Sequence, residues 1–89
     1  MSLNFPNLSR SFEPEQNRIR FWGYDRAMEV TFFMKVETLM AVCPGVGKEE
    51  ADLLEAFDTK IERIRRAASK VYARRRDLSY VHFLVEQDF

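Results

Sequence analysis

Cys43 and His82 belong to the residue types most often used in catalysis and metal binding, and the chain contains one of each. A nucleophilic thiol needs a nearby base or cation that lowers its pKa, but Cys43 lies between an apolar segment and Pro44. A zinc site built mainly from Cys and His cannot be assembled from these two residues. We therefore expect a buried or half-buried Cys43 and an exposed His82, with no catalytic residue, no metal and no cofactor.

The segment Gly45-Val46-Gly47-Lys48 has the ending of a phosphate-binding loop, in which backbone N–H groups cradle phosphate oxygens. Val42 stands where that motif requires its first glycine. Glu49 follows the lysine, where the motif requires Ser or Thr. The segment is therefore interpreted as an ordinary connection.

A strong charge gradient follows this segment. Residues 47–58 hold one positive and five negative side chains, whereas residues 59–76 hold eight positive and one negative. Acidic residues near the start of a helix and basic residues near its end complement the helix dipole, so a solvated helix explains the gradient. The alternative is anion or nucleic-acid binding, because phosphate contacts need clustered cations. Its candidate residues are Arg63, Arg65, Arg66, Lys70, Arg74, Arg75 and Arg76.

Residues 18–24 and 28–36 alternate with a period of two and are rich in aromatic and β-branched side chains, which predicts a β-hairpin. With Asp25 and Arg26 as the turn, the residue numbers of two directly opposite positions add up to 51. This register places the pairs Ile19–Phe32, Phe21–Val30 and Gly23–Met28 on the core face.

The same register places basic and aromatic side chains together on the other face of the hairpin, namely Arg18, Arg20, Trp22, Tyr24 and Phe33. Aromatic rings on a sheet can stack nucleobases. We favour a protein contact instead, because neither aromatic signature of the common RNA-binding sheet modules is present. Arg18 is expected to pair with Phe33, and the face to be covered by residues 1–12 or by a second subunit.

The remaining segments complete an α+β fold. Residues 9–13 form a strand that joins the hairpin through a turn at 14–17, and a short helix runs from residue 37 to a point before Pro44. From Glu49 a long amphipathic helix of about seven turns is expected. The pair Thr59 and Glu62 resembles a capping box that would break this helix near Asp58, but we favour continuity.

Residues 80–85 form a last strand, with Val81, Phe83 and Val85 on one face and Tyr80, His82 and Leu84 on the other. The predicted architecture is a small antiparallel sheet, made of a β-hairpin meander and this C-terminal strand, with both helices packed on one face. The centre of the core is predicted to contain Phe21, Phe32, Phe57, Ile61 and Ile64.

Several short segments, taken in order, resemble the small bacterial family catalogued as domain of unknown function 1488. They are Leu3-Asn4-Phe5-Pro6-Asn7, Ser9-Arg10-Ser11, Arg20-Phe21-Trp22-Gly23-Tyr24-Asp25, Glu29-Val30-Thr31-Phe32, Leu53-Leu54-Glu55-Ala56-Phe57-Asp58, Val71-Tyr72-Ala73-Arg74 and Asp88-Phe89. The resemblance spans nearly the whole chain. It implies a free-standing bacterial α+β domain and carries over no activity, ligand or functional residue.

The composition is that of one small globular domain: 89 residues, 46% hydrophobic, with 14 basic and 14 acidic side chains and no net charge. No secretory or membrane-spanning segment is apparent, so we expect a soluble cytoplasmic protein without a membrane partner.

The aromatic residues on the outer sheet face, with Tyr80 and Leu84 added, predict a two-fold homodimer or a contact with another protein. The predicted function is a non-enzymatic interaction module. The alternative is a nucleic-acid-associated accessory or regulatory protein that uses the Arg-rich helix end or this sheet face.

Overall fold

The computed structural model describes residues 3–7, 9–74 and 79–89, which form an α+β fold with a mixed five-stranded sheet and three α-helices. The elements in chain order are β1 (Leu3–Asn4), β2 (Arg10–Glu13), β3 (Arg18–Asp25), β4 (Met28–Lys35), α1 (Val36–Val42), α2 (Glu50–Thr59), α3 (Ile61–Arg74), β5 (Val81–Leu84) and the 3-10 turn η1 (Glu86–Asp88). The expected strand before the turn at 14–17 and the helix that stops before Pro44 are both present.

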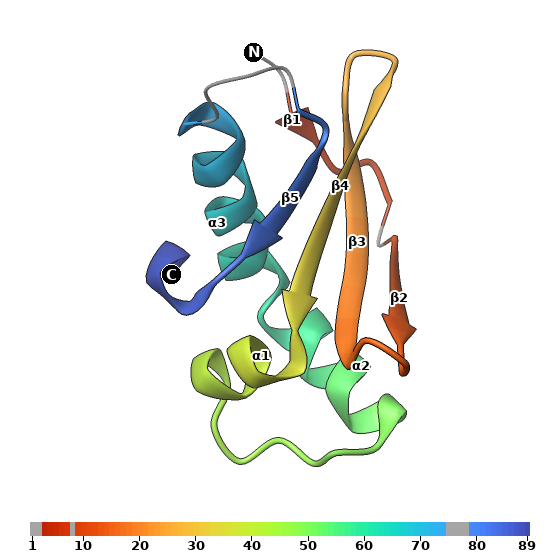
Figure 1. Ribbon diagram of the computed structural model, residues 1–89, viewed down its shortest axis with the longest axis vertical. Helices are drawn as coiled ribbons and strands as arrows, with labels where there is room; N and C mark the ends of the chain where they lie inside the picture. The colour runs from red at the N-terminus through yellow and green to blue at the C-terminus, as the bar shows by residue number, and fades with distance from the viewer. Residues whose placement is uncertain (1–2, 8, 75–78) are drawn as a thin grey trace.

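The antiparallel pair β3 and β4 forms the centre of the sheet and runs along the length of the molecule (Figure 1). Both β1 and β2 pair antiparallel with the other edge of β3. The last strand corrects the prediction of a wholly antiparallel sheet, because β5 pairs parallel with β4. Three helices lie between β4 and β5 in the chain, which is the long crossover that a parallel pair requires.

The hairpin register differs from the prediction by two residues. The turn residues are Arg26 and Ala27, so Phe21 pairs with Phe32 and Gly23 pairs with Val30. Arg26 has a φ of 59°, which is the positive value that the common two-residue hairpin turns need at their first loop position. A shift of two residues equals the period of the pleat, so the predicted core face is retained although the predicted partners are wrong.

The long helix predicted from Glu49 is broken at Lys60, which has φ −100° and ψ 16° and separates α2 from α3. The Thr59 hydroxyl donates a hydrogen bond to the Glu55 carbonyl at 2.8 Å, so it completes the last turn of α2 instead of capping α3. The Lys60 N–H still reaches carbonyls of α2 at 3.1 and 3.2 Å. Phe57 and Ile64 both face the core, while Ile61 stays partly exposed.

The core lies between the sheet and the helices. Of the residues predicted for its centre, Phe21, Phe32, Phe57 and Ile64 are buried. The rings of Phe21 and Phe32 stack with centroids 5.2 Å apart. The core also contains large buried side chains outside that predicted centre, among them Met34, Leu39, Tyr72 and Leu84. The Tyr72 hydroxyl donates a hydrogen bond to Asp25 and so joins α3 to the turn end of the hairpin.

The described part of the N-terminal segment packs on the helix side of the sheet. The Phe5 ring lies 6.3 and 6.2 Å from the rings of Phe21 and Phe32, both of which face the helices. Phe5 also lies against Gly23, where a Cβ atom would come within 2.8 Å of the Phe5 ring and 2.6 Å of the Asn4 carbonyl oxygen. This glycine allows the segment to approach closely, and Phe5 does not cover the outer face of the sheet.

Candidate functional site

The five predicted residues of the outer sheet face lie together in the structure. Burial alternates along β3, where Ile19, Phe21 and Gly23 face the helices and the residues between them face outward. The guanidinium of Arg18 lies 3.8 Å from the centroid of the Phe33 ring, as the sequence indicated, although the register places Arg20 directly opposite Phe33. We call the outward-facing side chains of β2, β3, β4 and β5 the open face. From the first three strands it includes Ser11, Glu13, Arg18, Arg20, Trp22, Tyr24, Glu29, Thr31, Phe33 and Lys35.

β5 extends the open face with residues that the sequence reasoning assigned to the opposite side. The parallel register aligns Val81 with Thr31 and Phe83 with Phe33, and the rings of Phe33 and Phe83 stack with centroids 5.2 Å apart. Val81, Phe83 and Val85 are 52%, 56% and 45% exposed. Leu84 is buried, so the prediction that it contributes to the outer surface is wrong.

His82 also points inward, which corrects its predicted exposure. Its ring is half-buried and lies 5.7 Å from the Phe32 ring and 5.8 Å, edge-on, from the Tyr72 ring. One ring nitrogen is 3.0 Å from the Ser79 carbonyl oxygen. Within the described ranges, no group of three or more His, Cys, Asp or Glu side chains is placed to hold a metal ion.

The open face carries both signs of charge. Arg18 Nε donates a hydrogen bond to Glu13 at 2.6 Å, and Arg20 lies 3.5 Å from Glu29. Lys35 is exposed at the end of β4. The arginines also cover aromatic rings, because Arg20 lies 4.5 Å from the Trp22 ring in addition to the contact of Arg18 with Phe33. The result is a mixed apolar and charged surface instead of a basic one.

The free edge of the sheet along β5 is largely occupied by the chain's own polar groups. In the parallel register, Val81, Phe83 and Val85 direct their backbone groups away from β4. The Ser79 hydroxyl accepts a hydrogen bond from the Val81 N–H at 3.4 Å and donates one to its carbonyl at 3.1 Å. The Val85 N–H donates to the Asp88 carboxylate at 2.8 Å. These bonds hinder the addition of another strand at this edge.

The Arg-rich cluster of the sequence is divided in the structure. Arg74 donates a hydrogen bond to Asp88 at 3.0 Å, and Arg65 reaches the Asn7 carbonyl at 3.1 Å and lies 5.2 Å from the Phe5 ring. Arg75 and Arg76 lie outside the described residues. The three residues Arg63, Arg66 and Lys70 remain exposed along α3.

A different arginine, Arg10, ties β2 to α2. Its Nε and Nη2 atoms each donate a 2.8 Å hydrogen bond to Asp58, in a two-pronged pair. These bonds raise the pKa of the Arg10 guanidinium above its ordinary value. Because arginine is already charged throughout the physiological range, the raised pKa leaves its charge unchanged there, and the pair serves to position the edge of the sheet.

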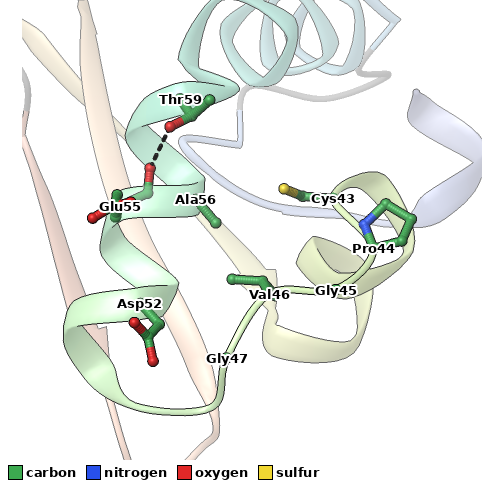
Figure 2. A pocket seen from close by; sticks show the side chains of 9 residues that line it. All are labelled: Cys43, Pro44, Gly45, Val46, Gly47, Asp52, Glu55, Ala56 and Thr59. Carbon is green, nitrogen blue, oxygen red and sulfur yellow. Dashed lines mark hydrogen bonds between the residues drawn. The ribbon is translucent and has the colours of Figure 1, made fainter.

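A pocket of about 310 Å³ lies between the loop after α1 and one side of α2 (Figure 2). Cys43, half-buried as expected and not in a disulfide, lies on one side, and Asp52, Glu55 and Thr59 lie on the other. The described residues that line this pocket include no His, Lys or Arg. They therefore provide no basic side chain that would activate the Cys43 thiol.

These features define a class of small α+β protein in which helices cover one face of a mixed sheet and leave the other open. The chain belongs to the family described as protein of unknown function DUF1488, whose sequence profile matches residues 3–84. This match confirms the resemblance seen in the sequence.

A solved structure supports the same fold. The chain is similar to the crystal structure of a DUF1488-family protein of unknown function from Shewanella loihica PV-4, with a TM-score of 0.76 and 13% sequence identity. The likeness covers 93% of this chain and 91% of that one, and at this identity it shows the fold alone. No match was found among the curated proteins. Within the part of the chain that the structure describes, no helix is both long and apolar enough to cross a membrane.

Proposed function

We propose that this protein is a non-enzymatic interaction module that forms a two-fold dimer through its open face. The observation that carries the proposal is the apolar stripe on β5. Val81, Phe83 and Val85 are three of the four large hydrophobic residues exposed among the described residues. The register with β4 places Val81 and Phe83 on this face, and Val85 continues their alternation in extended backbone just after β5. Contiguous exposed apolar side chains are typical of interaction surfaces.

The apolar stripe is continuous with the rest of the open face, because Phe83 stacks on Phe33 and Phe33 contacts Arg18. An association that buries this surface removes apolar area from water at about 25 cal/mol per Å². Two sheets pack face to face at a separation of about 10 Å. A second copy of this sheet therefore provides a partner of suitable shape.

The charges of the open face favour a second copy over a polyanion. Glu13 and Glu29 lie beside Arg18 and Arg20, so a two-fold arrangement can bring opposite charges of the two copies together at the rim. Nucleobases would have to displace the guanidinium groups that already lie on the Phe33 and Trp22 rings. Nucleic-acid binding on this face is therefore the weaker alternative.

The size of the open face predicts a dimer of modest affinity. The two central strands have eight residues each. The flanking strands β2 and β5 have four residues each. At about 3.3 Å per residue and about 4.8 Å between strands, these four strands span roughly 380 Å² in projection. This area is below the roughly 600 Å² per partner at which stable interfaces begin and is typical of transient contacts, so we expect a dissociation constant on the order of 10 µM.

Replacing Phe83 with glutamate tests the proposal. The new carboxylate would be buried against the partner, so we expect Phe83→Glu to raise the dissociation constant of the dimer by about tenfold or more. Sedimentation equilibrium at several protein concentrations measures this constant, and circular dichroism verifies that the variant remains folded.

The matched control is Met28→Glu. Met28 is 51% exposed, but it lies at the end of the hairpin and its side chain is on the helix side of the sheet. This substitution should leave the dissociation constant unchanged. A wild-type protein that stays monomeric at about 100 µM, or equal effects of the two substitutions, would contradict the proposal.

A further inference from the structure

A second feature lies on the helix side of the molecule, away from the open face. A hollow of about 100 Å³ is formed where α3 meets the C-terminal residues. Arg63, Arg66 and Lys70 contribute cationic side chains to it, and Ala67, Asp88 and Phe89 complete its lining. The spacing of the three cations, i, i+3 and i+7, places them along one side of the helix.

The three cations of this hollow form no ion pair with the described residues. Their ion pairs involve Arg10, Arg18, Arg20 and Arg74, and none involves Arg63, Arg66 or Lys70. The one acidic side chain in the lining is already engaged, because Asp88 accepts hydrogen bonds from Arg74 at 3.0 Å and from the Val85 N–H at 2.8 Å. Three cations therefore share a concave surface, and the acidic side chain in it, Asp88, is hydrogen-bonded to groups other than these cations.

The remaining lining residues give the hollow its shape. Ala67 lies between the cationic positions on α3 and is 2% exposed, so its short side chain leaves the space above it open. The Phe89 ring forms a wall, and the Arg63 guanidinium lies 6.0 Å from the centroid of that ring. This contact orients one of the cations toward the C-terminal side of the hollow.

We propose that this hollow binds one compact oxyanion of the phosphate class, either inorganic phosphate or the phosphate group of a small monoester. Arginine and lysine side chains are the groups that proteins use to bind phosphate oxygens. A hollow of about 100 Å³ has room for a single phosphate group and not for a large ligand.

The surroundings favour a compact ligand over a nucleic acid. Glu62 on α3 and Glu86 on η1 are exposed on elements that adjoin the hollow. These carboxylates would repel the successive phosphates of an extended polyanion. The chain also has no net positive charge that would attract such a polymer over a long range.

Titration with phosphate, followed by the backbone amide signals in nuclear magnetic resonance, tests this proposal. Sodium phosphate and phenyl phosphate are added separately at pH 7, with sodium chloride adjusted to keep the ionic strength constant. We expect saturable shifts for residues 63–70 and 86–89, with a dissociation constant on the order of 1 mM. Tighter binding of phenyl phosphate would assign the site to organic monoesters that also contact Phe89, whereas equal binding would assign it to the phosphate group alone.

The double variant Arg66→Gln with Lys70→Gln should weaken binding by about tenfold or more, since two of the three cations are lost. Lys48→Gln is the matched control, because it removes an exposed cation from the loop before α2 and should leave the dissociation constant unchanged.

Shifts that do not saturate, or equal affinities for the wild type and the double variant, would identify the helix as a solvated surface that complements its own dipole and would overturn the proposal. Binding of a single-stranded oligonucleotide more than about tenfold tighter than phosphate, with a steep salt dependence, would also overturn it in favour of a polymeric ligand.

Discussion

Replacing Phe32 with alanine is expected to lower the free energy of unfolding by about 3 to 5 kcal/mol. The Phe32 side chain is fully buried, stacks on Phe21 at 5.2 Å and lies 5.7 Å from the His82 ring. Its removal leaves a cavity where the hairpin, the N-terminal segment and β5 meet. Denaturant unfolding at about 1 µM protein, below the expected dissociation constant of the dimer, measures this loss.

The adjacent residue Phe33 is the matched control. It has the same side chain but lies on the open face against Arg18 and Phe83. Phe33→Ala should therefore lower the free energy of unfolding of the monomer by about 1 kcal/mol or less. A loss from Phe33→Ala as large as that from Phe32→Ala would mean that the inner face of the hairpin has been assigned incorrectly.

The second large loss of stability is expected in β5, the strand whose core-facing side the residue pattern does not identify. Leu84 is 2% exposed and packs in the core, so Leu84→Ala should lower the free energy of unfolding by about 2 to 5 kcal/mol. Its neighbour Phe83 is 56% exposed, and Phe83→Ala should cost less than about 1 kcal/mol under the same monomeric conditions.

The order of these two losses is diagnostic, because adjacent residues of a strand point to opposite faces of the sheet. A larger loss for Phe83→Ala than for Leu84→Ala would place Phe83 in the core. The apolar stripe that supports the dimer would then be absent from the open face.

The hairpin shows how much the residue pattern could predict. Alternation of polar and apolar residues identified its two faces correctly, because the helix side must be apolar. The predicted turn is one residue too early, because neither Asp25-Arg26 nor Arg26-Ala27 has the Asn-Gly or Asp-Gly pattern that marks two-residue turns. The error changed the cross-strand partners but left all five predicted residues of the open face in place.

β5 could not be oriented from its own sequence. Both of its faces carry large apolar side chains, with Val81 and Phe83 on one and Leu84 beside His82 on the other. The parallel pairing with β4 and the contact of His82 with Tyr72 decide between the two faces, and both are long-range features. The sequence reasoning therefore missed the most exposed part of the candidate site.

The break between α2 and α3 was also uncertain from the residues alone, since Lys60 is neither proline nor glycine. The division of the Arg-rich cluster depends on distant partners, because Arg65 reaches Asn7 and Arg74 reaches Asp88. A charge gradient along the chain gives no indication of which cations pair within the molecule and which stay exposed.

The most direct test of the dimer through the open face is an isotope-filtered nuclear Overhauser experiment on a mixture of labelled and unlabelled protein at a concentration well above the dissociation constant. This experiment detects only protons that are close together in different copies of the chain. The proposal predicts intermolecular signals from Val81, Phe83 and Val85 to residues of the open face such as Trp22 and Phe33. Absence of intermolecular signals, or signals that arise from α3 or from the backbone edge of β5 instead, would contradict it.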